Sequence, residues 1–324
     1  MRKPAPLSRW DRAVAAFLTS QRALGRAYQA EEYALNLVRK FLVEADADDL
    51  TGALFDGWRH SCAHLSISTR LRWERILHKF CRHRRRTELG CFLPDPHSFV
   101  QLKPYPLPRI VSRSQVAQLL SACSPRRRRG RRSRLHGQIM RCAVVLLYTA
   151  GLRRGEIVRL TLGDVDATTG VLRIRDSKFH KSRWVPLSSS ATRELQRYLR
   201  VRRRAGFDRR PEAPLFCTLA GEAYGGVAFR TRFLALCQAA GVRGSDGRCP
   251  RLHDMRHSFA VGALLRWYDN DQDVQVQLPR LAMYMGHISI ASTAYYLRVM
   301  PAVMQRASER FARSCPHLLE GGVT

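Results

Sequence analysis

The stretch YTAGLRRGEIVRL, residues 148–160, places arginines and a glutamate directly after an apolar run. Gly151 is a residue type that ends helices, so we expect Arg153 at a turn, where its planar fork can bind a phosphate. Glu156 follows three residues later and can hold an arginine or cap a backbone amide. The pattern G-L-R-x-x-E is short, and on its own a structural ion pair would explain it.

Two further patterns lie in the second half of the chain. In LHDMRHSFA, His253 and Arg256 are three residues apart and therefore share one face of a helix. In MYMGHISIASTAYYLRV, a helix should end at Gly286, just before His287, and the next helix carries the pair Tyr295-Tyr296. Taken singly, the first pattern is best explained by a surface histidine beside an ordinary arginine, and the second by a packed tyrosine pair.

Hydrophobic periodicity predicts the helices and strands that carry these residues. The helix Ile139–Ala150 is apolar nearly all round, which predicts the core of a second domain. Two β-like runs, Val171–Arg175 and Arg183–Leu187, are separated by polar residues and predict an antiparallel hairpin. A helix capped by Ser189 or Ser190 follows, and the remainder is expected to be mainly helical.

The first 86 residues contain helical patterns only. Ser8 is expected to cap the first helix, and Ser68 is expected to cap the third one. Five prolines between Pro94 and Pro108 disfavour helix, so we expect an extended connector and a domain boundary over residues 87–108. Ser112 then opens a new helix.

The charge of the chain limits its partners. The 324 residues include 56 basic and 26 acidic side chains, a formal net charge of +30, which favours a polyanion such as nucleic acid. Seven arginines within residues 126–134 predict a loop that follows phosphates. The longest apolar run, residues 142–152, is too short to cross a bilayer, and we expect no signal peptide. Nine scattered cysteines without a C-x-x-C pair predict reduced thiols, no zinc site and a cytoplasmic protein.

Taken in order, these patterns and a lysine in the hairpin turn resemble the tyrosine recombinase (phage integrase) family. The resemblance covers residues 108–324, and the helical N-terminal segment with its linker is similar to the core-binding domain of that family. It implies a mainly α fold with a small antiparallel β-sheet, whose two domains form a C-shaped clamp on DNA. The implied core-binding domain spans residues 8–86, the Pro-rich linker residues 87–108, and the catalytic domain with its C-terminal tail helix residues 109–324.

The resemblance also implies a role for each residue of the site. The implied set comprises two phosphate-clamping arginines, a lysine that protonates the leaving oxygen, two histidines and a nucleophile: Arg153, Arg256, Lys178, His253, His287 and Tyr296. Glu156 would be a structural acid, and His253 would activate the nucleophile. Lys181 competes with Lys178, and Tyr295 competes with Tyr296, although the spacing from His287 favours Tyr296. His257 is expected to face away from His253 and to pack.

The implied activity is site-specific cleavage and rejoining of double-stranded DNA through a 3′-phosphotyrosyl intermediate, without metal, cofactor or ATP. It would serve integration, excision or resolution of a mobile element or replicon, within a tetrameric synapse on two DNA sites and without a membrane. A DNA-binding accessory protein that has lost the chemistry and a tyrosine topoisomerase are the alternatives. The tail helix would pack either on a neighbouring copy or on its own domain.

Overall fold

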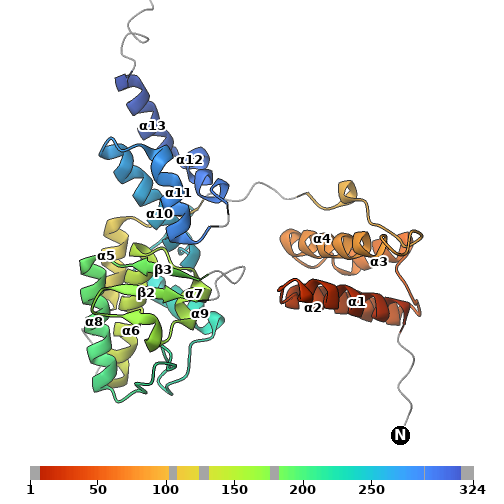
Figure 1. Ribbon diagram of the computed structural model, residues 1–324, viewed down its shortest axis with the longest axis horizontal. Helices are drawn as coiled ribbons and strands as arrows, with labels where there is room; N and C mark the ends of the chain where they lie inside the picture. Colours follow the sequence, from red (N-terminus) through yellow and green to blue (C-terminus); the bar gives the residue numbers. More distant parts are fainter. Residues whose placement is uncertain (1–7, 102–107, 124–130, 176–181, 288, 315–324) are drawn as a thin grey trace, which may run out of the picture. The chain divides into compact units, whose positions relative to one another are not determined.

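A computed structural model of the protein describes residues 8–101, 108–123, 131–175, 182–287 and 289–314. The chain divides into two compact units, residues 1–106 and 107–324 (Figure 1). Each unit buries a hydrophobic cluster of its own. The expectation of a mainly helical protein with one small antiparallel sheet is confirmed.

The N-terminal unit consists of helices that pack around aromatic side chains. These are α1 (Arg9–Ala23), α2 (Gln29–Glu44), α3 (Gly52–Ser61) and α4 (Ile67–Arg84), which Figure 1 shows as two layers. Trp10 and Phe17 both make edge-to-face contacts with Phe80. The Ser8 cap of α1 is confirmed, because its side chain accepts a hydrogen bond from a first-turn amide. The short helix α3 was not predicted.

The expected start of α4 is wrong by two residues. Ser66, and not Ser68, caps this helix and accepts a hydrogen bond from the backbone N–H of Thr69. The two serines are close enough that hydrophobic periodicity alone does not separate them. Ser66 has the extended backbone conformation that an N-cap requires, whereas Ser68 already lies in the first turn.

The proline-containing segment is non-helical apart from the 3-10 turn η1 (Pro96–Ser98), but its described part is not a bare connector. Phe99 is buried in the core of the N-terminal unit. Glu74 of α4 accepts hydrogen bonds from Arg59 and from the backbone N–H of Val100. Burial of this aromatic side chain therefore holds the segment against α4, which the proline count did not predict.

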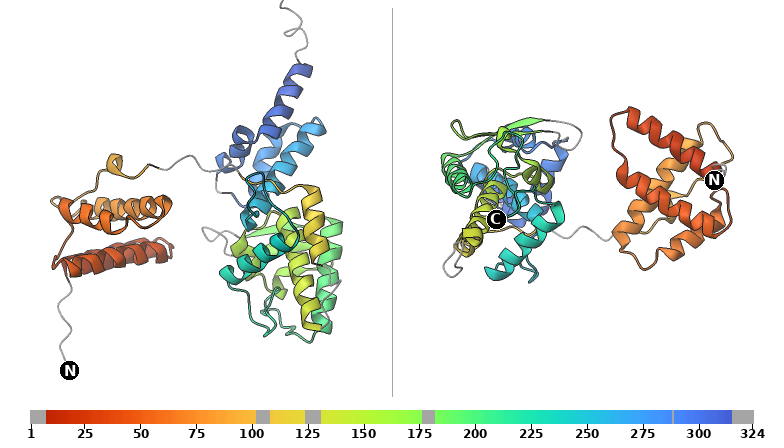
Figure 2. Two further views of the ribbon diagram at one scale, coloured as in Figure 1. Left: turned by 180° about the vertical axis from the view of Figure 1, so that it is seen from behind. Right: turned by 90° about the horizontal axis from the view of Figure 1, so that it is seen from below.

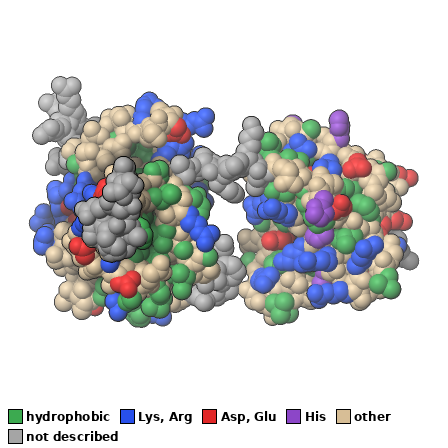
Figure 3. Space-filling model, turned by 90° about the horizontal axis from the view of Figure 1, so that it is seen from above, with side chains coloured by type: hydrophobic (Ala, Val, Ile, Leu, Met, Phe, Trp, Pro, Cys, Tyr) green, Lys and Arg blue, Asp and Glu red, His purple; other side chains and the backbone are tan. Residues whose placement is uncertain are grey.

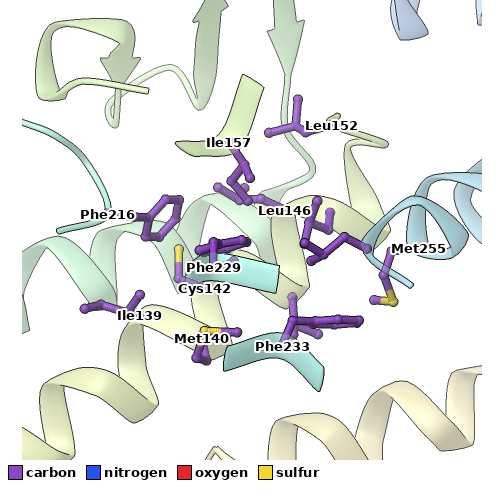
Figure 4. Packing of buried hydrophobic residues seen from close by; sticks show 14 of the residues in the cluster. Ile139, Met140, Cys142, Leu146, Leu152, Ile157, Phe216, Phe229, Phe233 and Met255 are labelled. Carbon is purple, nitrogen blue, oxygen red and sulfur yellow. The ribbon is translucent and has the colours of Figure 1, made fainter. Parts of the chain in front are cut away.

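The core of the C-terminal unit forms around one long apolar helix. This helix is α6 (Arg131–Thr149), and the core also takes side chains from α5 (Arg113–Ala122), α8 (Ser189–Arg204) and α9 (Gly226–Ala239). Phe229 and Phe233 of α9 lie beside Cys142 and Leu146 of α6 in a single buried cluster (Figure 4). Helix α9 also contacts α5 (Figure 2). The predicted core position of residues 139–150 is confirmed.

The sequence predicted serine N-caps for two helices of this unit, α5 and α8. Ser112 caps α5 as predicted, in a capping box with Gln115. Helix α8 is capped by Ser188, and not by Ser189 or Ser190. Three consecutive serines offer the same side chain, and the one with extended backbone conformation directly before the helix becomes the cap.

The predicted hairpin is confirmed and belongs to a three-stranded antiparallel sheet. Its strands, in spatial order, are β1 (Val165–Asp166), β2 (Val171–Ile174) and β3 (Arg183–Pro186). Leu172 pairs with Val185, and Ile174 pairs with Arg183. The hairpin turn that carries Lys178 and Lys181 lies outside the described residues, as do residues 126–130 of the predicted arginine-rich loop. Residues 131–134 begin helix α6, so a loop is wrong for that part of the segment.

The remaining elements complete the C-terminal unit. They are α7 (Arg154–Arg159), η2 (Leu162–Asp164), α10 (Leu252–Asp269), α11 (Val274–Met285), α12 (Ala291–Val299) and α13 (Pro301–Ser314). The tail helix α13 packs on α10 of its own chain: Val303 is fully buried, and Arg310 donates to the carbonyl oxygen of Gln272. Met304 and Phe311 of α13 are 52% and 63% exposed. No helix within the described ranges is long and apolar enough to cross a membrane.

Candidate active site

A buried carboxylate organises the turn between α6 and α7. Helix α6 is followed by Gly151, whose φ of +59° lies in the left-handed region, and Arg153 is the N-cap of α7. Glu156 accepts hydrogen bonds from the backbone N–H of Arg153 at 2.8 Å and from its Nη1 at 2.7 Å. The expected turn at Arg153 and the pairing with Glu156 are both observed.

Glu156 also binds a second arginine, which the sequence did not point out. Arg183, at the start of β3, donates Nη1 and Nη2 to the two carboxylate oxygens at 2.8 and 3.0 Å. Burial opposes ionisation of Glu156, which is 3% exposed, but the hydrogen bonds and charges of Arg183 and Arg153 outweigh it and lower its pKa to about 2. The carboxylate therefore remains ionised and fixes both guanidinium groups.

The two arginines expected to clamp a phosphate converge on the turn between α11 and α12. Arg153 Nη2 donates to the carbonyl oxygen of Gly286 at 2.5 Å. Arg256, which is 1% exposed on α10, donates to the carbonyl oxygens of Gly151 and Met285, both at 2.6 Å. These bonds connect the α6–α7 turn, α10 and the end of α11, which are far apart in sequence.

Positive charge exceeds negative charge within this cluster. Three guanidinium groups, those of Arg153, Arg183 and Arg256, surround the single carboxylate of Glu156. Burial, and then the charge of Arg153, lower the pKa of Arg256 to about 9. An anion bound beside Arg256 would offset this unfavourable concentration of charge, so the electrostatics of the pocket favour a phosphate.

Two histidines of α10 lie one helical turn apart on one face. The rings of His253 and His257 meet edge to face with centroids 4.5 Å apart, so the expectation that His257 faces away is wrong. Residues four apart on a helix are neighbours, so the spacing of these two histidines in the sequence already indicated their contact. His257 Nδ1 lies 2.7 Å from the hydroxyl oxygen of Tyr296. Burial, and then the charge of His253, lower the pKa of His257 to about 4.

The two adjacent tyrosines of α12 have different surroundings. Tyr296 is 3% exposed and faces His257, and burial raises its pKa to about 12 against the opposing charge of Arg256. Tyr295 is 37% exposed. Tyr296 therefore lies within hydrogen-bond distance of an imidazole and is affected by the charge of the Arg256 guanidinium group.

His287 follows the C-terminal glycine of α11. Gly286 has a φ of +68° and ends the helix as predicted. His287 Nδ1 is 2.6 Å from the hydroxyl of Thr293 on α12. Burial, and then the charges of Arg256 and Arg153, lower the pKa of His287 to about 3. The imidazole is therefore neutral near pH 7 and can donate or accept a hydrogen bond.

The structure thus gathers five of the six expected residues: Arg153, His253, Arg256, His287 and Tyr296. The sixth, Lys178, and its competitor Lys181 are not among the residues described. Within the described part of the chain, no group of three or more His, Cys, Asp or Glu residues could hold a metal ion. The eight cysteines described there are free, and seven of them are buried. The site therefore combines guanidinium groups, imidazoles and a phenol, the groups that anion binding and proton transfer use.

A mainly helical fold with a small sheet, together with this cluster of arginines, histidines and a tyrosine, is typical of the tyrosine recombinases. A model of the phage integrase family matches residues 109–302, which is more than half of the protein. The chain belongs to the phage integrase family.

One relative matches nearly the whole chain, and another matches about two thirds of it. A Sinorhizobium fredii protein that carries the name of an integrase/recombinase, y4rB, is 34% identical over 95% of this chain and 98% of its own length. The tyrosine recombinase XerD of Pseudomonas aeruginosa is 32% identical over 67% of this chain and 66% of its own length. Among solved structures, the Tn1549 transposon integrase in complex with transposon right end DNA matches with a TM-score of 0.65 at 17% identity, covering 93% of this chain and 98% of that one.

Proposed function

We propose that this protein cleaves and rejoins duplex DNA at specific sites through a covalent 3′-phosphotyrosyl intermediate. One observation carries the proposal: the phenol of Tyr296 on α12 lies 2.7 Å from His257 of α10, and the charge of the adjacent residue Arg256 acts on that phenol. A phosphodiester needs charge neutralisation, a nucleophile and a proton for the leaving oxygen, and this pocket supplies the first two.

Each residue has a task in this reaction. Arg153 and Arg256 would bind the non-bridging oxygens and stabilise the negative charge that grows as the tyrosine oxygen attacks phosphorus. The tethering of both arginines to carbonyl oxygens of the α11–α12 region fixes their separation before DNA arrives. His287 would donate a hydrogen bond to the same phosphate, and Lys178 would protonate the 5′ oxygen as it departs. The phosphotyrosyl bond conserves the energy of the broken bond, so rejoining needs no ATP.

The N-terminal unit would hold the duplex. On α4, Arg72, Arg75, Lys79 and Arg82 follow one another at spacings of three and four residues and therefore share a face. The three arginines of this set are exposed. Figure 3 shows basic side chains, with histidines among them, on one face of the unit. Such a stripe suits the phosphate backbone and supports a core-binding role, with affinity that falls steeply with salt.

The proposal extends to the assembly, the cellular compartment and the DNA rearrangement that the reaction serves. We infer that the reaction joins paired DNA sites within a tetramer of the chain, in the cytoplasm, and that it integrates, excises or resolves a mobile element or replicon. The 34% identity to a protein named as an integrase/recombinase supports this reading. The +30 charge supports a duplex as the partner.

Trapping the covalent intermediate tests the proposal. The full chain is incubated with a library of nicked duplexes that carry a randomised core, the reaction is stopped with SDS, and protein–DNA adducts are resolved on a denaturing gel. We expect an adduct with the wild type and with Tyr295→Phe, and none with Tyr296→Phe. An adduct that persists in Tyr296→Phe, or no adduct with the wild type, would overturn the assignment.

A further inference from the structure

We propose that His257 accepts the phenolic proton of Tyr296 during cleavage and returns it during rejoining. This inference rests on the proposed function and adds a catalytic residue to it. The resemblance assigned the activation of the nucleophile to His253. The contacts in the pocket assign it to the histidine one turn further along α10.

The geometry of the pair is that of a proton donor and its acceptor. The 2.7 Å separation between Tyr296 Oη and His257 Nδ1 is the length of a strong hydrogen bond. The imidazole of His257 also touches the ring of Tyr296 edge to face, with centroids 5.5 Å apart, and it packs against the ring of His253 on its other side. Contacts on two sides fix the orientation of the imidazole, so Nδ1 remains directed at the phenol.

The protonation states of the free protein suit this role. With a pKa of about 4, the imidazole of His257 is neutral near pH 7, so Nδ1 can offer a lone pair. With a pKa of about 12, Tyr296 retains its proton until a phosphate arrives. The charged groups that act on His257 are those of Arg251, Asp254 and Arg256, besides His253. A phosphate anion bound at Arg256 would offset the positive charge there and raise the proton affinity of His257.

The proposed step balances atoms and charge. The bond between Tyr296 Oη and phosphorus forms while the bond between phosphorus and the 5′ oxygen breaks. The phenolic proton moves to His257 Nδ1, which becomes an imidazolium, and the 5′ oxygen takes a proton from Lys178, which becomes a neutral amine. The 5′ hydroxyl reverses each transfer when it attacks the phosphotyrosyl bond. His253, which is exposed, is then available to hydrogen-bond a phosphate oxygen.

Two substitutions separate proton acceptance from packing. His257→Asn places an amide near the position of Nδ1, where it can hydrogen-bond to the phenol without accepting its proton, and His257→Phe keeps the ring alone. The matched control is His136→Asn, because His136 Nδ1 lies 3.3 Å from the hydroxyl of Tyr224 in the same unit. We expect both His257 variants to form the covalent adduct about 100- to 10,000-fold more slowly in a single turnover, with DNA affinity unchanged. The control should cleave at the wild-type rate.

A modified substrate identifies which proton transfer is lost. In a 5′-bridging phosphorothiolate, sulfur replaces the leaving oxygen and departs without being protonated. This substrate should restore cleavage to a variant that lacks the leaving-group acid, and it should not restore the His257 variants. The inference is overturned if His257→Asn cleaves within about threefold of the wild type, or if sulfur restores its rate.

A measurement without DNA keeps the two proposals distinguishable. In the full chain labelled with ¹⁵N-histidine, the signal absent from His257→Asn should show an unprotonated Nδ1 at pH 7. A proton on Nδ1 would overturn the role of His257 whatever the cleavage data show. A wild-type chain that forms no adduct would overturn the proposed function itself, whereas adducts formed at full rate by both His257 variants would overturn only this inference.

Discussion

Replacing Glu156 with glutamine should remove the charge that holds two guanidinium groups in place. The surroundings of Glu156 lower its pKa from 4.5 to about 2, which corresponds to about 3 kcal/mol in favour of the ionised carboxylate in the folded state. Removal of one partner from a buried ion pair typically costs about 3–5 kcal/mol, in the same range. We therefore expect Glu156→Gln to lower the free energy of unfolding of the C-terminal unit by about 3 kcal/mol at pH 7.

The pH dependence of this effect has a defined sign. The pKa of Glu156 is lower in the folded state than in the unfolded state, so its stabilisation is fully present above the unfolded value of 4.5 and is lost as the pH falls towards 2. By pH 4 about 1 kcal/mol of the wild-type advantage should have disappeared. The difference between the wild type and Glu156→Gln should therefore shrink on acidification.

The assay is hydrogen exchange along a urea series, followed by mass spectrometry of peptides from α6 and α7. Asp208→Asn is the matched control, because Arg210 also lowers the pKa of Asp208 to about 2 but that carboxylate is exposed. A solvated pair contributes little, so the control should unfold like the wild type. A role of the Glu156 charge in stability is ruled out if Glu156→Gln lowers the free energy of unfolding no more than Asp208→Asn does at pH 7, or if it lowers that free energy equally at pH 7 and pH 4.

Three further predictions concern the turn at Gly151, the histidine His287 and the effect of a metal chelator. Gly151→Ala should destabilise the protein by more than Gly206→Ala in urea unfolding: both have positive φ, but a Cβ at residue 151 would lie 2.5 Å from Phe259, and one at residue 206 meets nothing within 4 Å. Since the pKa of His287 is lowered to about 3, its contribution to stability is lost as the pH falls below about 6.5, and His287→Asn should reduce the slope of unfolding free energy against pH by up to about 1.4 kcal/mol per pH unit. Adduct formation should be unchanged in EDTA, and its loss there would contradict a mechanism that relies on side chains alone.

Features set by neighbouring residues were predictable from the sequence. The turn at Gly151, the hairpin, and the pairing of Arg153 with Glu156 all depend on spacings of a few residues, which helix and turn geometry dictates. The contact between His253 and His257 also follows from a spacing of four residues, so the expectation that His257 faces away from His253 contradicted helix geometry.

Features that depend on long-range packing could not be predicted in this way. Arg183 reaches Glu156 across 27 residues, and Tyr296 reaches His257 across 39. No periodicity connects such positions, because the contact arises only when the sheet and α12 dock on the helices around α6 and α10. Likewise, no local pattern indicates that Phe99 completes the N-terminal core after a proline-containing segment.

Identifying the residue that is joined to DNA is the most direct test of Tyr296 as the nucleophile. After the SDS-trapped adduct is treated with nuclease and trypsin, the peptide of residues 281–298 contains both Tyr295 and Tyr296, and fragmentation in a mass spectrometer distinguishes them. We expect a nucleotide joined through its 3′ phosphate to Tyr296. A nucleotide on Tyr295 or on another side chain, or one attached through a 5′ phosphate, would contradict it.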